Sequence, residues 1–213
     1  MGNGWARRAA VIAAGVVVVG WCVPQAVAHA GPRPTDRVEI KVVKTNGSGC
    51  RAGSAEVAVS PDNTAFTVTY STYLAQVGGD AKKKEATKDC KLSLRVVVPK
   101  DFTYAIGRTD YRGFAQLASG ATGRQSAKYY FNGAGKTAAV QHDFSGPYDD
   151  YWQTTDVGPS AYEPCGKQRH LNIDTEVTVK AGSSDPATLS VMAMDSTDGT
   201  IVKSTYQLLW KNC

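Results

Sequence analysis

Asp110 and Arg112 are the residues whose types and spacing come nearest to a binding site in this chain. In an extended strand side chains alternate between two faces, so Asp110 and Arg112 would share one face while Tyr111 points to the other. An arginine held by an aspartate can bind a carboxylate, a phosphate or sugar hydroxyls. An internal ion pair that braces the strand is the simpler interpretation, and we favour it because the two charges then satisfy each other without a ligand.

A second group of polar and aromatic residues lies between His142 and Trp152, around Gly146-Pro147, and this composition is typical of a loop. Aromatic rings offer flat apolar faces on which sugars stack, and carboxylates accept hydrogen bonds from hydroxyls. A calcium site is a weaker alternative, because Ca²⁺ takes six to eight oxygen ligands. Its ligands would come from Asp143, Asp149, Asp150 and Asp156. A polar loop with its aromatic rings packed over the sandwich edge is the simplest interpretation. The candidate ligand-binding residues are Tyr148, Asp149, Asp150, Tyr151 and Trp152, together with Arg112.

Patterns that would indicate catalysis are weak. His142 and His170 are the histidines beyond residue 30, and neither lies in a Gly-x-Ser-x-Gly or His-Glu-x-x-His motif. A glycosidase needs two carboxyl groups about 5–10 Å apart, and no spacing here singles out a pair. We therefore expect no catalytic residue, no metal and no cofactor, with a carbohydrate-active or other secreted hydrolase as the alternative. Acids that could supply such a pair include Glu39, Asp110, Asp150 and Glu163.

Residues 1–30 have the composition of a secretory signal peptide. Arg7 and Arg8 form a basic start, Ala9–Val23 is apolar, and small residues offer cleavage after Ala28 or Ala30. The apolar run is shorter than the roughly 20 residues that span a bilayer, so we expect secretion without stable membrane insertion. Residues 31–213 are then long enough for a single domain. The net charge of +5 is small and scattered, which argues against nucleic acid as a partner.

The cysteines indicate a disulfide framework. Once the signal peptide and Cys22 are removed, Cys50, Cys90, Cys165 and Cys213 remain, an even number in an exported chain without Cys-x-x-Cys spacing. Three connectivities are possible. We favour Cys50–Cys90 and Cys165–Cys213, because each closes one sequence-local half of the domain. Loops of this length predict about 3–4 kcal/mol of stabilisation per bridge.

Alternating apolar and polar residues predict strands throughout the mature chain. Val38–Val42, Leu92–Val98 and Leu171–Val179 show this pattern clearly, and about ten such runs are separated by glycine and proline turns. Leu189–Met194 and Thr200–Trp210 are predicted to pair as a hairpin around Asp195–Gly199. The fold class we expect is all-β, an antiparallel β-sandwich of jelly-roll-like form, with a closed barrel as the competing architecture.

Several short motifs follow one another along the chain: Gly47-Ser48-Gly49-Cys50 with Gly53-Ser54 downstream, Cys90-Lys91-Leu92, Asp110-Tyr111-Arg112-Gly113, Tyr130-Phe131, Gly146-Pro147, Pro164-Cys165-Gly166, Asp195-Ser196-Thr197-Asp198-Gly199 and Leu209-Trp210-Lys211-Asn212-Cys213. With these motifs in this order, the chain resembles the exported family known as domain of unknown function 4360 (DUF4360). The resemblance implies a small secreted domain with paired cysteines, and it implies no activity. Arg51 departs from the pattern, which would have proline after the loop cysteine.

Together these patterns predict a secreted, non-catalytic β-sandwich protein that acts as an extracellular binding or structural module. Carbohydrate is the favoured ligand class, and an extracellular or cell-wall glycan is the partner it would meet. A third alternative is an inhibitor of extracellular proteases, which needs a rigid exposed loop beside a disulfide. Asn46–Ser54, which contains Cys50, is the loop that could serve.

Overall fold

The computed structural model describes residues 31–134, 139–158, 161–194 and 203–213. The predicted signal peptide and the predicted turn Asp195–Gly199 lie outside these residues. Within the described ranges no helix is long and apolar enough to cross a membrane. The elements are β1 (Glu39–Asn46), β2 (Ala55–Val59), β3 (Ala65–Tyr70), β4 (Leu74–Val77), the short 3-10 turn η1 (Lys83–Glu85), β5 (Thr87–Val97), β6 (Phe102–Leu117), β7 (Thr122–Phe131), β8 (Val140–Ser145), β9 (Tyr148–Val157), β10 (Leu171–Lys180), β11 (Ser190–Ala193) and β12 (Lys203–Asn212).

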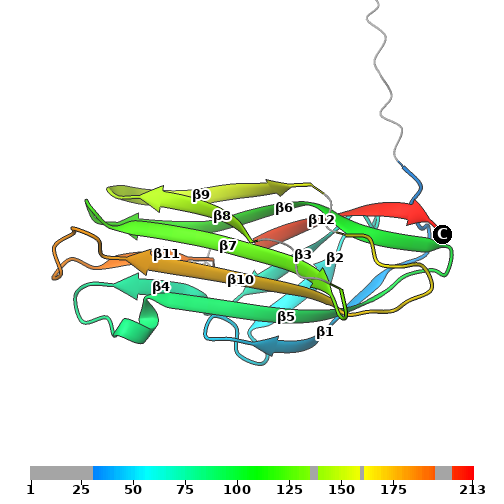
Figure 1. The fold of residues 1–213 in the computed structure, drawn as a ribbon, viewed down its shortest axis with the longest axis horizontal. Helices are drawn as coiled ribbons and strands as arrows, with labels where there is room; N and C mark the ends of the chain where they lie inside the picture. The colour runs from blue at the N-terminus through cyan, green and yellow to red at the C-terminus, as the bar shows by residue number, and fades with distance from the viewer. Residues whose placement is uncertain (1–30, 135–138, 159–160, 195–202) are drawn as a thin grey trace, which may run out of the picture.

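The strands form two antiparallel sheets, whose long strands run along the longest axis of the molecule (Figure 1). Sheet A has the order β1-β5-β10-β7-β8. Sheet B has the order β2-β3-β12-β6-β11-β4, and β9 pairs with β6. This architecture confirms the predicted all-β, antiparallel sandwich.

Alternate residues of the two sheets fill the space between them. Tyr104 of β6 meets Phe131 of β7 edge to face, with ring centroids 5.5 Å apart. Tyr129 of β7 meets Tyr206 of β12 at 6.3 Å. Burying a large side chain of this kind stabilises the fold by roughly 1.5–3 kcal/mol. Rings from opposite sheets therefore form a continuous core between them.

β6 is the organising strand of sheet B. β12 pairs with its first part, where Tyr206 faces Thr109, and β11 pairs further along, where Ala193 faces Phe114. β9 pairs with one edge of β6 from Arg108 to Leu117. β12 and β11 therefore lie end to end along the opposite edge of β6 and do not pair with each other. The predicted hairpin between Leu189–Met194 and Thr200–Trp210 is therefore wrong, because β6 provides a longer partner for both strands.

The two disulfides are Cys50–Cys90 and Cys165–Cys213, which confirms the predicted connectivity. They close loops with sequence separations of 40 and 48 residues. The second bridge holds the last residue of the chain, and the Cys213 backbone N–H also donates to the Asp101 carbonyl at 2.9 Å. Both bridges therefore restrain segments that flank strands.

Candidate functional site

The acid and aromatic segment that was predicted to be a loop forms two strands of different sheets, joined by a turn. β8 runs to Ser145, a tight turn with a cis Gly146–Pro147 peptide bond follows, and β9 begins at Tyr148. β9 then pairs with β6 along its whole length. The loop prediction was wrong because the glycine and proline occupy only the turn. The pleat of β9 consequently divides the candidate residues between two faces.

Trp152 lies on the inner face of β9 and is only 3% exposed. Its ring packs against Phe144, with centroids 5.5 Å apart, and a Cβ at Gly113 would lie 2.3 Å from the ring. Burial removes Trp152 from the candidate binding surface and makes it a core residue. Tyr148 is half-buried, with its ring 5.9 Å from Phe144.

The outer face of β6 and β9 carries the candidate residues Arg112, Asp149 and Tyr151, and we call it the outer strip. Facing residues form rungs across the two strands: Phe114 faces Tyr151, and the neighbouring rungs follow at intervals of about 7 Å along the strands. Tyr151 is 45% exposed, and its ring contacts Phe114 edge to face at 5.6 Å. The strip consists of Asp110, Arg112, Phe114 and Gln116 on β6, facing Thr155, Gln153, Tyr151 and Asp149 on β9.

Asp110 and Arg112 share the outer face while Tyr111 is fully buried, as the alternation predicted. The predicted ion pair between Asp110 and Arg112 does not form, because Arg108 is the partner of Asp110. Arg108 donates to Asp110 from Nε at 2.9 Å and from Nη2 at 2.7 Å, and this interaction holds the pKa of Asp110 below its usual range. Thr155 Oγ1 also donates to Asp110 at 2.6 Å.

Arg112 takes its partner from β9 instead. Its Nε donates to Gln153 Oε1 at 3.1 Å, and the side chain is exposed. The sequence could not distinguish Arg108 from Arg112 as the partner of Asp110, since both stand two residues away. The facing strand decides, because it places Thr155 beside Asp110 and Gln153 beside Arg112.

Asp149 and Asp150 are both exposed near the start of β9. Asp149 faces Gln116 across the strands, and Asp150 Oδ1 accepts a hydrogen bond from the Tyr151 backbone N–H at 2.7 Å. The structure therefore brings Arg112, Asp149 and Tyr151 to one face, whereas Asp150 faces the buried Ala115 and lies on the same side of β9 as Trp152. In the described ranges no group of three or more His, Cys, Asp or Glu residues is placed to hold a metal ion.

A buried polar network between the sheets was not recognised from the sequence. His142 Nε2 lies 2.7 Å from Asp156 Oδ1, and the Tyr129 hydroxyl donates to Asp156 Oδ2 at 2.9 Å. The hydroxyl of Tyr111 hydrogen-bonds that of Tyr129. The sequence did contain one relevant signal, the two-residue spacing of Trp152, Thr154 and Asp156, which places the three side chains on one face of a strand. This spacing does not indicate that His142 lies beside that face.

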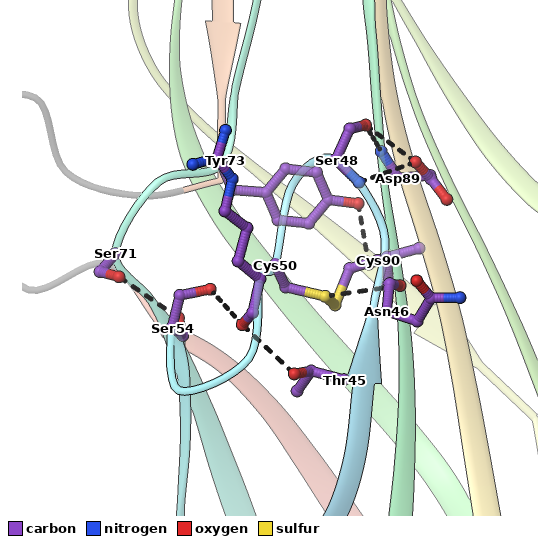
Figure 2. Close-up of a disulfide and its surroundings, with 11 residues drawn as sticks. Thr45, Asn46, Ser48, Cys50, Ser54, Ser71, Tyr73, Asp89 and Cys90 are labelled. Atoms are coloured by element: carbon purple, nitrogen blue, oxygen red, sulfur yellow. Dashed lines mark hydrogen bonds between the residues drawn. A yellow bond between two sulfur atoms is a disulfide. The ribbon is translucent and has the colours of Figure 1, made fainter.

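The loop Asn46–Ser54 surrounds the Cys50–Cys90 bridge (Figure 2). A protease inhibitor that binds like a substrate must offer its scissile carbonyl to the oxyanion hole. The exposed Arg51 would be the natural contact residue, but its carbonyl accepts from Ser54 N at 3.0 Å, from Ser54 Oγ at 2.9 Å and from Thr45 Oγ1 at 3.2 Å. This closed turn gives the inhibitor hypothesis little support.

Comparison with solved structures finds a match to the enzymatically active domain of bacteriophage CBA120 tailspike protein 4. The identity is 10%, the match covers 80% of this chain and 19% of that chain, and the TM-score is 0.27. This chain thus spans about a fifth of the tailspike chain, and the low TM-score supports no conclusion about fold or activity.

Comparison with known sequences is more informative. The chain is 31% identical, over 181 residues, to an uncharacterized secreted protein of Arthroderma benhamiae, and the match covers 84% of this chain and 73% of the relative. Disulfides form and persist in oxidising compartments, so the two bridges agree with that relative's secretion. The model of a domain of unknown function, DUF4360, matches residues 36–213. The chain therefore belongs to the DUF4360 family.

Proposed function

We propose that this protein is a non-catalytic extracellular module that binds carbohydrate through the outer strip. Residues 1–30 direct export and are removed, and residues 31–213 act as one domain. The secreted relative and the two disulfides support the extracellular location.

The exposed ring of Tyr151 carries the proposal. A large aromatic ring costs free energy when water covers it, and Tyr151 remains 45% exposed on a strand whose inner face buries Trp152. Phe114 supports the ring from β6 at 5.6 Å, so Tyr151 has little freedom to lose when a ligand stacks on it. An exposed ring that a neighbouring ring supports suits the apolar face of a sugar.

Polar groups beside the ring suit the hydroxyls of the same sugar. Arg112 and Gln153 lie one rung from Tyr151 on one side, and Gln116 and Asp149 lie one rung away on the other. Four rungs span roughly 20 Å at the rise of an antiparallel strand. An open surface of this length favours contact along a chain of sugars rather than enclosure of a single one.

The hydrolase alternative has less support from the described acids. Burial raises the pKa of Glu163, as a general acid requires. However, Glu163 is only 3% exposed, and its carboxylate accepts the backbone N–H of Arg169. A glycosidic oxygen could not reach this carboxyl group without displacing the packing around it.

The test is a glycan array and a polysaccharide pull-down with the purified mature protein and a Tyr151→Ala variant. We expect wild-type protein to bind at least one glycan and the variant to lose roughly tenfold or more in affinity, since stacking and ordering are both lost. Tyr162→Ala is the matched control, because Tyr162 is an exposed tyrosine, at 39%, outside β9. The proposal fails if wild type binds no glycan, or if Tyr151→Ala binds as well as wild type.

A further inference from the structure

An amide, a hydroxyl, an imidazole and a carboxylate lie close together between the two sheets, on β7, β8 and β9. Gln125 of β7 and His142 of β8 are register partners, so they are neighbours on the inner face of sheet A. Thr154 and Asp156 of β9 are two residues apart on the inner face of sheet B. The contact between His142 and Asp156 joins the two sheets.

Thr154 and Gln125 are in direct contact across the interior. Thr154 Oγ1 donates to Gln125 Oε1 at 3.3 Å, with Gln125 fully buried and Thr154 9% exposed. Gln125 Nε2 has no hydrogen-bond partner among the described residues. A buried amide donor without a partner destabilises a fold, and an apolar side chain of similar size would remove that cost. The one hydrogen bond that Gln125 accepts from Thr154 therefore leaves the cost of its buried amide N–H uncompensated.

We propose that Thr154 and Gln125 form an intramolecular ester that cross-links the two sheets. The Thr154 oxygen attacks the side-chain carbonyl carbon of Gln125, forming a C–O bond. The C–N bond of the carboxamide breaks, and its nitrogen leaves as ammonia after taking the hydroxyl proton. No oxidant, reductant or other reactant takes part. Burial keeps water away from the product and protects the ester from hydrolysis.

His142 and Asp156 supply the proton transfer that this step needs. His142 Nε2 is held 2.7 Å from Asp156, which the Tyr129 hydroxyl orients from the other side at 2.9 Å. His142 is the register partner of Gln125, and Asp156 stands two residues from Thr154 on the same face of β9. The pair takes the proton from the attacking hydroxyl and returns it to the departing nitrogen.

The ester would join parts of the sandwich that the disulfides leave separate. Cys50–Cys90 joins β5 to the loop after β1, and Cys165–Cys213 joins the chain end to the segment before β10. A Thr154–Gln125 bond instead links β9 of sheet B to β7 of sheet A. It lies on the inner face of β9, opposite the outer strip, and is independent of glycan binding.

The decisive measurement is the intact mass of the purified, folded mature protein. We expect wild type to be lighter, by one ammonia, than the chain with two disulfides, and peptide mapping after reduction to find Gln125 joined to Thr154. Hydroxylamine, which cleaves esters, should separate the two peptides. Thr154→Val and Gln125→Met should show no loss of ammonia. Two results with the wild-type protein alone would overturn the proposal: a folded protein that has lost no ammonia, or a loss of ammonia that maps to another residue.

A second experiment tests the roles of His142 and Asp156. His142→Ala is refolded, its fold is checked by circular dichroism and disulfide mapping, and the fraction of cross-linked chains is followed by mass. General acid–base catalysis contributes about 10²–10⁴-fold, so we expect cross-linking to be at least tenfold slower. Added imidazole should restore part of the rate, which a merely structural role would not predict. Cross-linking at the wild-type rate overturns the assignment of His142.

Discussion

The two faces of β9 differ in what they contribute, although their residues alternate along a single strand. The inner face places Trp152, Thr154 and Asp156 against sheet A, where they are at most 9% exposed. The outer face presents Tyr151 and Gln153 to solvent. Neighbouring residues of similar chemistry therefore have separate roles, since stability depends on the inner set and the proposed binding depends on the outer set.

Trp152→Ala should give the largest effect. Removing a buried tryptophan leaves a cavity, and such substitutions cost about 3–5 kcal/mol of unfolding free energy. Guanidinium unfolding monitored by circular dichroism measures the loss. A cost below about 1 kcal/mol would show that the inner face of β9 is not packed as described.

Tyr129→Phe should have an intermediate effect. The change removes the hydroxyl that donates to Asp156 and leaves a buried carboxylate with one partner fewer, which costs about 1–3 kcal/mol. Tyr130→Phe is the control, because its hydroxyl lies on the outer face of sheet A at 3.4 Å from Asp174. Equal losses for the two variants would contradict a special role of the inner network.

Asp110→Asn should have a smaller effect, about 0–1 kcal/mol, because the Arg108 side chain is 42% exposed and water screens the pair. The folded state lowers the pKa of Asp110, so its contribution is present above the ordinary value of 3.8 and is lost as pH falls through the lower folded value. Stability curves of wild type and variant should therefore converge in acid. Salt should reduce the difference at neutral pH.

Tyr151→Ala should have the smallest effect on stability, within about 0.5 kcal/mol, because exposed substitutions change few contacts. The same variant should show the largest loss of glycan binding. Thermal unfolding and glycan binding measured on one preparation separate the two effects. A variant that loses both equally would place Tyr151 with the core rather than with the outer strip.

The amino-acid sequence determined the fold class, the disulfide partners and which residues of β6 face the core. Alternation of apolar and polar residues is a local signal, so it correctly put Asp110 and Arg112 on one face and Tyr111 on the other. The cysteines could be paired because each predicted bridge joins residues within one half of the chain. These predictions needed no knowledge of which strands are neighbours.

Tertiary structure alone decided which residues meet. Arg108 rather than Arg112 pairs with Asp110, and Trp152 enters the core, because β9 lies beside β6 in one particular register. His142 reaches Asp156, and Gln125 reaches Thr154, only because sheet A packs on sheet B. Contacts between sheets depend on register and packing over the whole domain, whereas the alternation of side chains within a strand is a property of the local backbone.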